Sequence, residues 1–418
     1  MTKRRVVITG LGCVTPIGVG KEEFWNGLVS GKNGIGLITR FDTTDFPVKI
    51  AGEVKDWDYT KYIDKKEGKR MDLVTQYAVT AAKLAFEDAK LDMANEDPLR
   101  AGVCVASGIG GMDTFIEQTG KYLEKGPSKV SPLFIPMEIP NMSAGQIAIA
   151  LGLKGPNTCI VTACASGTNC IGDALRTIQY GDADIMFAGG TEAAVNPLAI
   201  AGFANMKALS RNNEHPEEAS CPFSAERNGF VLGEGSGVLV LEELEHAKAR
   251  GAHIYCELAG FAMNCDAYHI TAPDPTGQTP AKAMAQAIND AVLEPTDIYY
   301  INAHGTSTHL NDLGETKAFK EVFADHAYKL SVSSIKSMIG HLLGAAGGVE
   351  AIATALTIEN DLIPPTINYK TVDHDEECDM NLDYVPNEAR TRVVNAAMSD
   401  NLGFGGHNAV IVMKKYVE

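Results

Sequence analysis

Short apolar runs alternate with amphipathic stretches along most of this chain. Runs with the β-branched and apolar composition of buried strands cover residues 6–10, 101–107 and 184–188. Apolar positions with the spacing of helices that pack on a sheet cover residues 75–91, 146–151 and 168–180. Strands that alternate with helices in this way predict an α/β fold built from βαβ units.

The same alternation starts again near residue 253. Strand-like runs cover residues 253–260, 299–303, 330–333 and 409–414, and helical spacing covers residues 280–292 and 350–359. We therefore predict two similar α/β halves, residues 1–252 and residues 253–418. The segment 107–142 is rich in Gly and Pro, interrupts the first half, and is predicted to form a lid or a subunit contact.

Composition narrows the classes of protein that fit this pattern. The 418 residues carry a net charge of −17, which disfavours nucleic acid and an anionic membrane as primary partners. No apolar run approaches ~18 residues, so no membrane-spanning helix is expected. The nine cysteines form no CxxC pair, which argues for reduced thiols rather than a disulfide frame or a zinc site. We expect a cytoplasmic protein, because the N-terminal apolar run is too short for a signal peptide.

A basic run stands out against the acidic background. It comprises Lys61, Lys65, Lys66, Lys69 and Arg70. Such a run is either a solvated helix face or a docking surface for an acidic protein.

Cys164 is the first candidate for chemistry. It lies where a β-type run gives way to small residues and then to the helical pattern of residues 168–180. A helix N-terminus lowers the pKa of a cysteine and leaves backbone N–H groups free to bind an oxyanion, so this turn resembles a nucleophile elbow. The alternative is a buried cysteine that serves only as a small apolar side chain.

Two histidines follow strand-like runs in the second half. His304 and His341 both lie in Gly-rich surroundings, and strand ends of this kind converge on one site in α/β folds. A neutral His341 at the start of a small-residue helix is suited to donate an N–H to an oxyanion. Lys336 would strengthen that effect, with Asp312 and Glu315 expected to hold the lysine. Each of these residues also has a structural alternative, a satisfied core histidine or a surface ion pair.

Glycines surround Phe404 in the segment 403–406. They predict a mobile loop on which the ring can swing, and the backbone N–H of Phe404 is placed to complete an oxyanion hole. A plain Gly-rich turn is the alternative.

Five segments together resemble the β-ketoacyl-[acyl carrier protein] synthases, the condensing enzymes of the thiolase-like superfamily. They are residues 162–167, 229–235, 302–308, 336–341 and 403–406. The resemblance covers nearly the whole chain in order and is closest to the enzymes of bacterial type II fatty acid synthesis. It implies a thiolase-like duplicated αβαβα five-layer fold and a homodimer.

The resemblance also implies a reaction. Cys164 takes an acyl group from acyl carrier protein, with the N–H groups of Cys164 and Phe404 as the oxyanion hole. Malonyl-acyl carrier protein loses CO₂ while His304 and His341 donate to the enolate oxygen, and the carbanion attacks the thioester. Because decarboxylation drives the step, no strong carboxylate base is required. No cofactor is expected.

Further residues receive roles only through this resemblance. Thr306 and Thr308 contact the pantetheine arm, while Ile109 and Phe134 line the acyl tunnel, Phe134 across the dimer. The carrier docks on Lys66, Lys69, Arg70 and Lys207. A buried monovalent cation is held by Asn302, Glu350 and Ser399. Asp400, Leu402 and His407 depart from the residues usual in the family.

Other classes fit less well. A thiolase uses a second cysteine in the final Gly-rich loop, and residues 403–408 contain none. A non-catalytic chain-length subunit would lack the nucleophile, and a thioester hydrolase would need a base to activate water. A polyketide-type ketosynthase acting on a different acyl chain remains the alternative, because it shares every catalytic residue.

Overall fold

The computed structural model describes residues 3–417, and its centre is a large mixed sheet. The strands of this sheet are β1 (Val6–Thr15), β2 (Gly18–Val19), β5 (Ala101–Ala106), β6 (Asn157–Thr158), β7 (Ile185–Glu192), β8 (Gly235–Glu243), β9 (Cys256–Cys265), β10 (Tyr300–Asn302), β11 (Ser331–Ser333), β14 (Ala396–Gly403) and β15 (His407–Lys414). Two short pairs lie apart from it, β3 (Ile35–Leu37) with β4 (Ile50–Gly52) and β12 (Leu362–Ile363) with β13 (Arg390–Thr391).

The strand order repeats between the two halves of the sheet. It runs β6-β5-β7-β8-β1-β9-β15-β14-β10-β11, with β2 paired to β1. In the first half β5 lies parallel to β6 and β7, and β8 and β1 continue antiparallel. In the second half β10 lies parallel to β11 and β14, and β15 and β9 continue antiparallel. The chain therefore builds one topology twice and joins the copies where β1 pairs with β9; the boundary at 252/253 stays a prediction.

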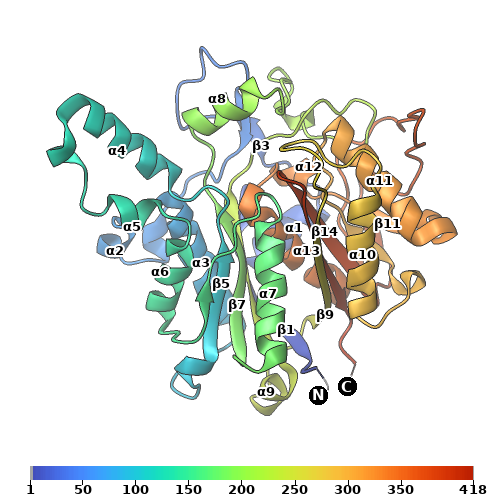
Figure 1. Ribbon diagram of the computed structural model, residues 1–418, viewed down its shortest axis with the longest axis horizontal. Helices are drawn as coiled ribbons and strands as arrows, with labels where there is room; N and C mark the ends of the chain where they lie inside the picture. The colour runs from blue at the N-terminus through green and yellow to red at the C-terminus, as the bar shows by residue number, and fades with distance from the viewer. Residues whose placement is uncertain (1–2, 418) are drawn as a thin grey trace.

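Helices cover the sheet in layers. The long ones are α3 (Leu73–Asp88), α6 (Met142–Leu151), α7 (Ser166–Tyr180), α10 (Gln278–Asp290), α11 (His309–Phe323) and α13 (Ala346–Asn360). Helices α3 and α6 lie on one outer side, α10 and α11 on the other, and α7 and α13 between the two halves of the sheet (Figure 1). The expected five-layer αβαβα arrangement is present, since buried apolar side chains fill each space between layers.

The remaining helices are shorter or lie at the margins. They are α1 (Lys21–Val29), α2 (Lys65–Gly68), α4 (Met112–Lys125), α5 (Phe134–Glu138), α8 (Pro197–Asn205), α9 (Leu244–Ala249) and α12 (Lys336–Ile339). Most of α4 projects from the body of the molecule (Figure 1), within the segment predicted to be a lid or a subunit contact.

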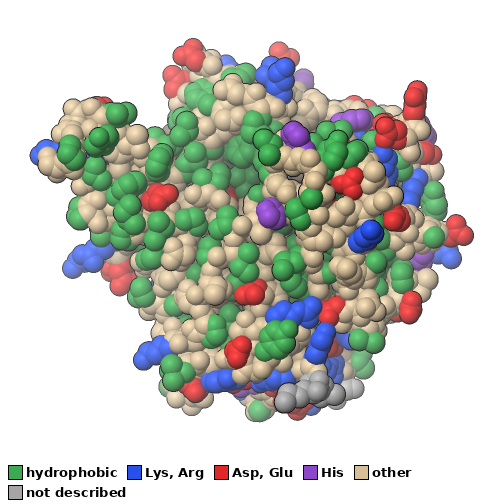
Figure 2. All heavy atoms as spheres, in the orientation of Figure 1, with side chains coloured by type: hydrophobic (Ala, Val, Ile, Leu, Met, Phe, Trp, Pro, Cys, Tyr) green, Lys and Arg blue, Asp and Glu red, His purple; other side chains and the backbone are tan. Residues whose placement is uncertain are grey.

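Apolar side chains remain exposed on that projecting segment. They include Phe115, Tyr122, Leu123, Leu133 and Ile135, and green side chains gather over the region of α4 and α5 in Figure 2. A patch of this kind marks an interaction surface more often than a solvated face. Among residues 3–417, no helix has both the length and the apolar character needed to cross a bilayer.

Candidate active site

A cavity of about 590 Å³ lies where the ends of several strands meet. Its lining includes the four residues that the sequence analysis placed at the centre of the chemistry, namely Cys164, His304, His341 and Phe404. These residues come from four separate segments of the chain, and the fold brings them together. The candidate site is therefore a product of tertiary structure rather than of one local motif.

Cys164 lies on a tight turn just before α7. Ala163 has a left-handed backbone, with φ of 51°, and the N–H of Ala165 donates to the carbonyl oxygen of Thr162 at 3.1 Å. A non-glycine residue in this region is strained, which is typical of a nucleophile elbow. Gly403 packs against the same turn: a Cβ there would lie 2.7 Å from the oxygen of Thr162, so the Gly-rich loop approaches the nucleophile as only glycine allows.

The pKa of the Cys164 thiol differs from the value that the sequence predicted. Burial raises the pKa of its thiol to about 12, although Lys336 and the N–H groups of Phe404 and of Cys164 itself act in the opposite direction. The predicted lowering of the pKa by the helix N-terminus is thus wrong for the free protein, because the cost of a buried thiolate exceeds that effect. The backbone N–H groups of Cys164 and Phe404 nevertheless favour negative charge at the sulfur.

The ring of His304 is held in one tautomer. Its Nδ1 lies 3.4 Å from Nζ of Lys336 and 3.1 Å from Nδ2 of Asn401. Both of these groups are donors, so Nδ1 accepts and the ring hydrogen is on Nε2. Burial, with help from Lys336 and His341, holds the pKa of His304 well below its usual value, and the ring is neutral at physiological pH.

His341 lies beside it. The two ring centroids are 5.2 Å apart with an interplanar angle of 86°, and Phe230 packs against His341 at 5.3 Å. The backbone of His341 is fixed by hydrogen bonds to Val231 and Gly233 at 2.7 and 2.9 Å. Burial and the nearby Lys336 lower the pKa of His341 as well, so the cavity presents two neutral imidazoles.

The expected partners of Lys336 are wrong. Among the described residues, the Lys336 side chain forms its ion pair with Glu350, a residue of α13. Glu315 instead accepts the backbone N–H groups of His304 and Gly305 at 2.7 and 2.8 Å. Glu315 therefore supports the loop that carries His304 by accepting hydrogen bonds from its main chain.

Asp312 likewise lies away from Lys336. It accepts the N–H of Phe223 at 2.8 Å and faces the guanidinium of Arg227 at 3.8 Å. Burial raises the pKa of both Asp312 and Glu315, which shows how little water reaches this wall of the site.

Asn401 is a functional residue that the sequence analysis did not assign. Its Nδ2 also donates to Glu350 at 2.7 Å, and its Oδ1 accepts from Thr168. These contacts orient the amide so that Nδ2 faces His304. The signal was its position two residues before the Gly-rich loop at Gly403, although nothing in the sequence indicates which ring it contacts.

The proposed cation residues divide into two groups. Asn302 and Ser399 are register partners on β10 and β14, and Oδ1 of the first and Oγ of the second are buried without a hydrogen-bond partner among the described residues. Both oxygens fit a monovalent cation, which would be structural here. The side-chain oxygens of Glu350 are taken up by Lys336 and Asn401 instead. Cation binding stays a prediction.

Three of the four predicted substrate residues line the cavity, and Phe134 is not among the lining residues. Thr306 and Thr308 line it with their hydroxyl oxygens 2.9 Å apart, and Ile109 and Lys207 line it as well. Phe134 begins α5 and packs against Phe115, with ring centroids 6.3 Å apart. The other docking candidates are exposed on and just after α2, namely Lys66, Lys69 and Arg70.

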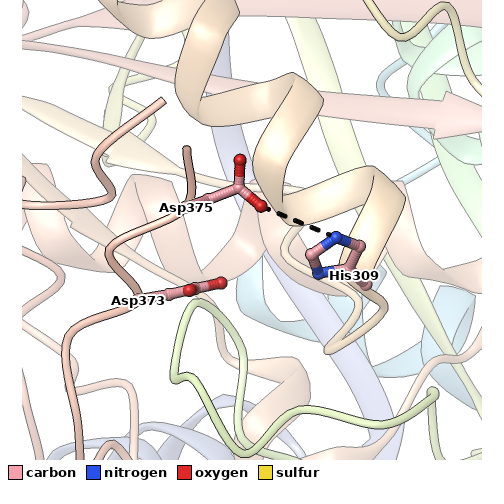
Figure 3. Close-up of side chains that lie close together, drawn as sticks. All are labelled: His309, Asp373 and Asp375. Atoms are coloured by element: carbon pink, nitrogen blue, oxygen red, sulfur yellow. Dashed lines mark ion pairs between the residues drawn. The ribbon is translucent and has the colours of Figure 1, made fainter. Parts of the chain in front are cut away.

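Three metal-ligand side chains also lie close together, namely His309, Asp373 and Asp375 (Figure 3), and His309 is one of the residues that line the cavity. Nε2 of His309 is 3.7 Å from Oδ2 of Asp375. Arg227 donates to Asp373 at 2.6 Å and lies 3.2 Å from Nδ1 of His309. Because a guanidinium only donates, Nδ1 accepts and Nε2 carries the hydrogen. The group is therefore an ion-pair network centred on Arg227.

Comparisons with known proteins agree with this geometry. Residues 3–247 match the family described as Beta-ketoacyl synthase, N-terminal domain, and residues 255–370 match Beta-ketoacyl synthase, C-terminal domain. A protein of Synechocystis sp. named 3-oxoacyl-[acyl-carrier-protein] synthase 2 is 53% identical over 416 residues, which is 100% of this chain and 99% of that protein. One of the same name from Staphylococcus aureus is 53% identical over 413 residues, 99% of each chain.

Solved structures share the fold over their full length. A type II PKS ketosynthase, in complex with its acyl carrier protein and bound to a hexaketide, superposes with a TM-score of 0.91 at 38% identity, covering 99% of this chain and 100% of that one. The ishigamide ketosynthase/chain length factor superposes with a TM-score of 0.93 at 36% identity, covering 100% of both chains.

Proposed function

This chain belongs to the β-ketoacyl synthase family, and from that membership we infer that it condenses an acyl group with malonyl-acyl carrier protein and releases CO₂. The product is a 3-oxoacyl-acyl carrier protein two carbons longer, which makes the protein an acyltransferase of fatty acid elongation. The observation that carries the mechanism is the fixed tautomer of His304, since a neutral ring with its hydrogen on Nε2 is a donor for an enolate oxygen.

The first half-reaction loads the enzyme. The sulfur of Cys164 attacks the thioester carbonyl of the acyl carrier, a new S–C bond forms, and the carrier thiol leaves with the proton. The N–H groups of Cys164 and Phe404, which favour negative charge at the sulfur, hold the oxyanion of the tetrahedral intermediate. A thiol with a raised pKa is an inert resting state, so its proton must be removed as substrate binds.

The second half-reaction makes the carbon–carbon bond. The malonyl C–C bond breaks to release CO₂, and its electron pair forms an enolate whose oxygen accepts from His304 and His341. The enolate carbon then attacks the acyl-Cys164 carbonyl, and the C–S bond breaks to return the sulfur. Neutral imidazoles suit this role because they stabilise the enolate without protonating its carbon.

The remaining assignments concern recognition. We place the pantetheine arm against Thr306 and Thr308, and the acyl chain against Ile109 and against Phe134 of a second protomer. Acyl carrier protein docks on Lys66, Lys69, Arg70 and Lys207. A homodimer through the α4–α5 region would bury its exposed apolar side chains. We propose a cytoplasmic location, consistent with nine free cysteines.

The test is a two-step assay with octanoyl- and malonyl-acyl carrier protein, following CO₂ and the mass of the Cys164 peptide. An acyl-Cys164 that is consumed on adding malonyl carrier, with 3-oxodecanoyl product, supports the proposal. Cys164→Ser should abolish condensation, and His304→Ala should leave acylation while it cripples CO₂ release. Preference for a polyketide precursor over octanoyl would favour the polyketide alternative, which the 38% identity to a type II PKS ketosynthase makes the second candidate.

A further inference from the structure

Glu192 is a buried carboxylate at the edge of the cavity. It is the last residue of β7, its side chain is fully buried, and it contributes to the cavity lining. Its Oε1 accepts the hydroxyl of Ser107 at 2.9 Å and the N–H of Ile109 at 3.2 Å. Its Oε2 accepts the N–H groups of Gly108 and Gly344 at 2.9 and 3.0 Å. Four donors therefore converge on one side chain.

The four donors come from two separate loops, residues 107–109 and the turn at Gly344. Ser107, Gly108 and Ile109 follow β5 and form the wall that the acyl chain would contact. Gly344 lies three residues after His341, and Leu343 between them has a left-handed backbone with φ of 46°. A leucine in that region is strained, so the turn needs an external constraint. The hydrogen bond from Gly344 to Glu192 supplies one directly after the strained residue.

Close packing makes this link specific. A Cβ at Gly108 or at Gly344 would lie 2.8 Å from Oε2 of Glu192, so both positions accept only glycine while the carboxylate is in place. The same Cβ at Gly108 would lie 3.8 Å from the carbonyl oxygen of Ala163, the residue before the nucleophile. The carboxylate thus adjoins the turn that carries Cys164.

The charge of Glu192 reaches the nucleophile. Burial raises the pKa of Glu192 to about 7, against the opposing effect of its hydrogen-bond donors. The carboxylate in turn raises the pKa of the Cys164 thiol, while the nearby Lys336 lowers it. Glu192 is consequently coupled to Cys164 electrostatically and to His341 mechanically.

We propose that Glu192 is a positioning residue for condensation, which holds the Ile109 wall and the turn bearing His341 in register with Cys164. It does not touch the reacting atoms; it acts through the main chain of two loops. This inference rests on the roles proposed above for Cys164 and His341. Because Glu192 also fixes the position of Ile109 in the cavity wall, it contributes to the selection of acyl-chain length.

The test compares Glu192→Gln with Glu242→Gln. The first exchange keeps the shape but turns an NH₂ group toward backbone donors. Glu242 is as buried as Glu192 and forms ion pairs with Arg250 and His246. It pairs with the first residue of β7, whereas Glu192 is the last residue of that strand, so the two carboxylates are separated by about 23 Å along the strand. It is the matched control for lost stability, because it is remote from the cavity.

Three readouts separate positioning from a structural role. Glu192→Gln should speed iodoacetamide alkylation of Cys164 at pH 8 about tenfold, since a charge that disfavours the thiolate is gone. It should slow CO₂ release about tenfold with acyl transfer changed less than threefold, and alter the preferred acyl length. Glu242→Gln should lower thermal stability with none of these changes.

An unchanged alkylation profile together with equal losses in both half-reactions would overturn the proposal. If Glu192→Gln does not fold, Ser107→Ala decides, because it removes one donor to Oε1 and should shift the same readouts in the same direction. Alkylation needs no carrier protein or condensation, so it tests the link between Glu192 and Cys164 even if the wild-type protein fails the two-step assay.

Discussion

The side-chain nitrogen of Lys336 lies 3.4 Å from Nδ1 of His304, and its ion-pair partner is Glu350. One buried lysine therefore both fixes the tautomer of a ring in the cavity and neutralises a carboxylate in the centre of the fold. The positive charge also lowers the pKa of His304 and His341, so it keeps both rings neutral.

Lys336→Met should slow CO₂ release from malonyl-acyl carrier protein by about tenfold to hundredfold. Without the Lys336 donor, Asn401 is the remaining described donor that holds the hydrogen of His304 on Nε2, so the tautomer is held less firmly. Without the charge, the pKa of His304 rises, so the acid limb of the rate profile should move to higher pH. CO₂ release measured from pH 5 to pH 8 checks the shift, and an acid limb at the wild-type position would contradict it.

The control for Lys336→Met is the double variant Lys336→Met/Glu350→Gln. The single variant leaves a buried carboxylate unpaired, which costs about 3–5 kcal/mol of stability. The double variant removes both charges and should recover most of that loss. The shifted acid limb should persist, because the ring of His304 still lacks the positive charge of Lys336 that lowers its pKa.

Alkylation of Cys164 should be slow at pH 7 and should rise with pH beyond pH 9. Burial raises the pKa of this thiol to about 12, so very little thiolate exists at neutral pH in the free protein. The exposed Cys265 is an internal control within the same chain. Mass spectrometry of the two peptides gives both rates, and a Cys164 that reacts faster than Cys265 at pH 7 would show that the helix N-terminus dominates after all.

The layering of the fold was predictable from the sequence because the buried strands are continuous apolar runs and the helices that cover them have helical apolar spacing. Apolar periodicity located β5, α3, α7, α13 and the repeat of strands and helices with errors of a few residues at their ends. Periodicity says nothing of which strands pair. That β1 meets β9, and so joins the two halves into one sheet, depends on long-range packing that no local pattern records.

The same limit applies to the site. Cys164, His304, His341 and Phe404 were predicted because their flanking glycines and strand ends are local features. The predicted partners of Lys336 were wrong because sequence alone does not show which carboxylate a buried lysine meets. Only the fold brings the side chain of Glu350, on α13, to Lys336 and leaves Asp312 and Glu315 with other partners. The net effect on the thiol of Cys164 was wrong for a related reason, since burial is a property of the whole fold.

Charge reversal on the basic surface should weaken docking of the carrier. Lys69→Glu combined with Arg70→Glu should raise the KM for malonyl-acyl carrier protein about tenfold, more strongly at low salt, because an acidic partner would meet like charge. Condensation of small pantetheine thioesters should be unaffected. Lys248→Glu, on α9 at the lower end of the molecule in Figure 1, is the control; an equal effect there would mean that only net charge matters.

Asp184 ties the first strand to the neighbouring part of the sheet. Its carboxylate accepts from Arg100 at 2.8 Å through two nitrogens and from Arg4 at 2.5 Å. These contacts, that of Arg100 first, hold the pKa of Asp184 well below its usual value. Asp184→Asn should therefore lower the free energy of unfolding at pH 7 by about 1 kcal/mol, allowing for solvent screening of a partly exposed group.

The pH dependence gives the sharper test of that network. A lowered folded-state pKa means that the carboxylate stabilises the fold at every pH above its unfolded value, about 3.9, and loses this effect as pH falls toward the folded value. Urea unfolding should show a constant gap between wild type and Asp184→Asn from pH 5 to pH 8, and a shrinking gap below pH 4. Asp182→Asn, exposed two residues away, should give no gap at any pH. A gap for Asp184→Asn that persists unchanged at pH 3 would mean that the side chain acts through shape and hydrogen bonding rather than through its charge.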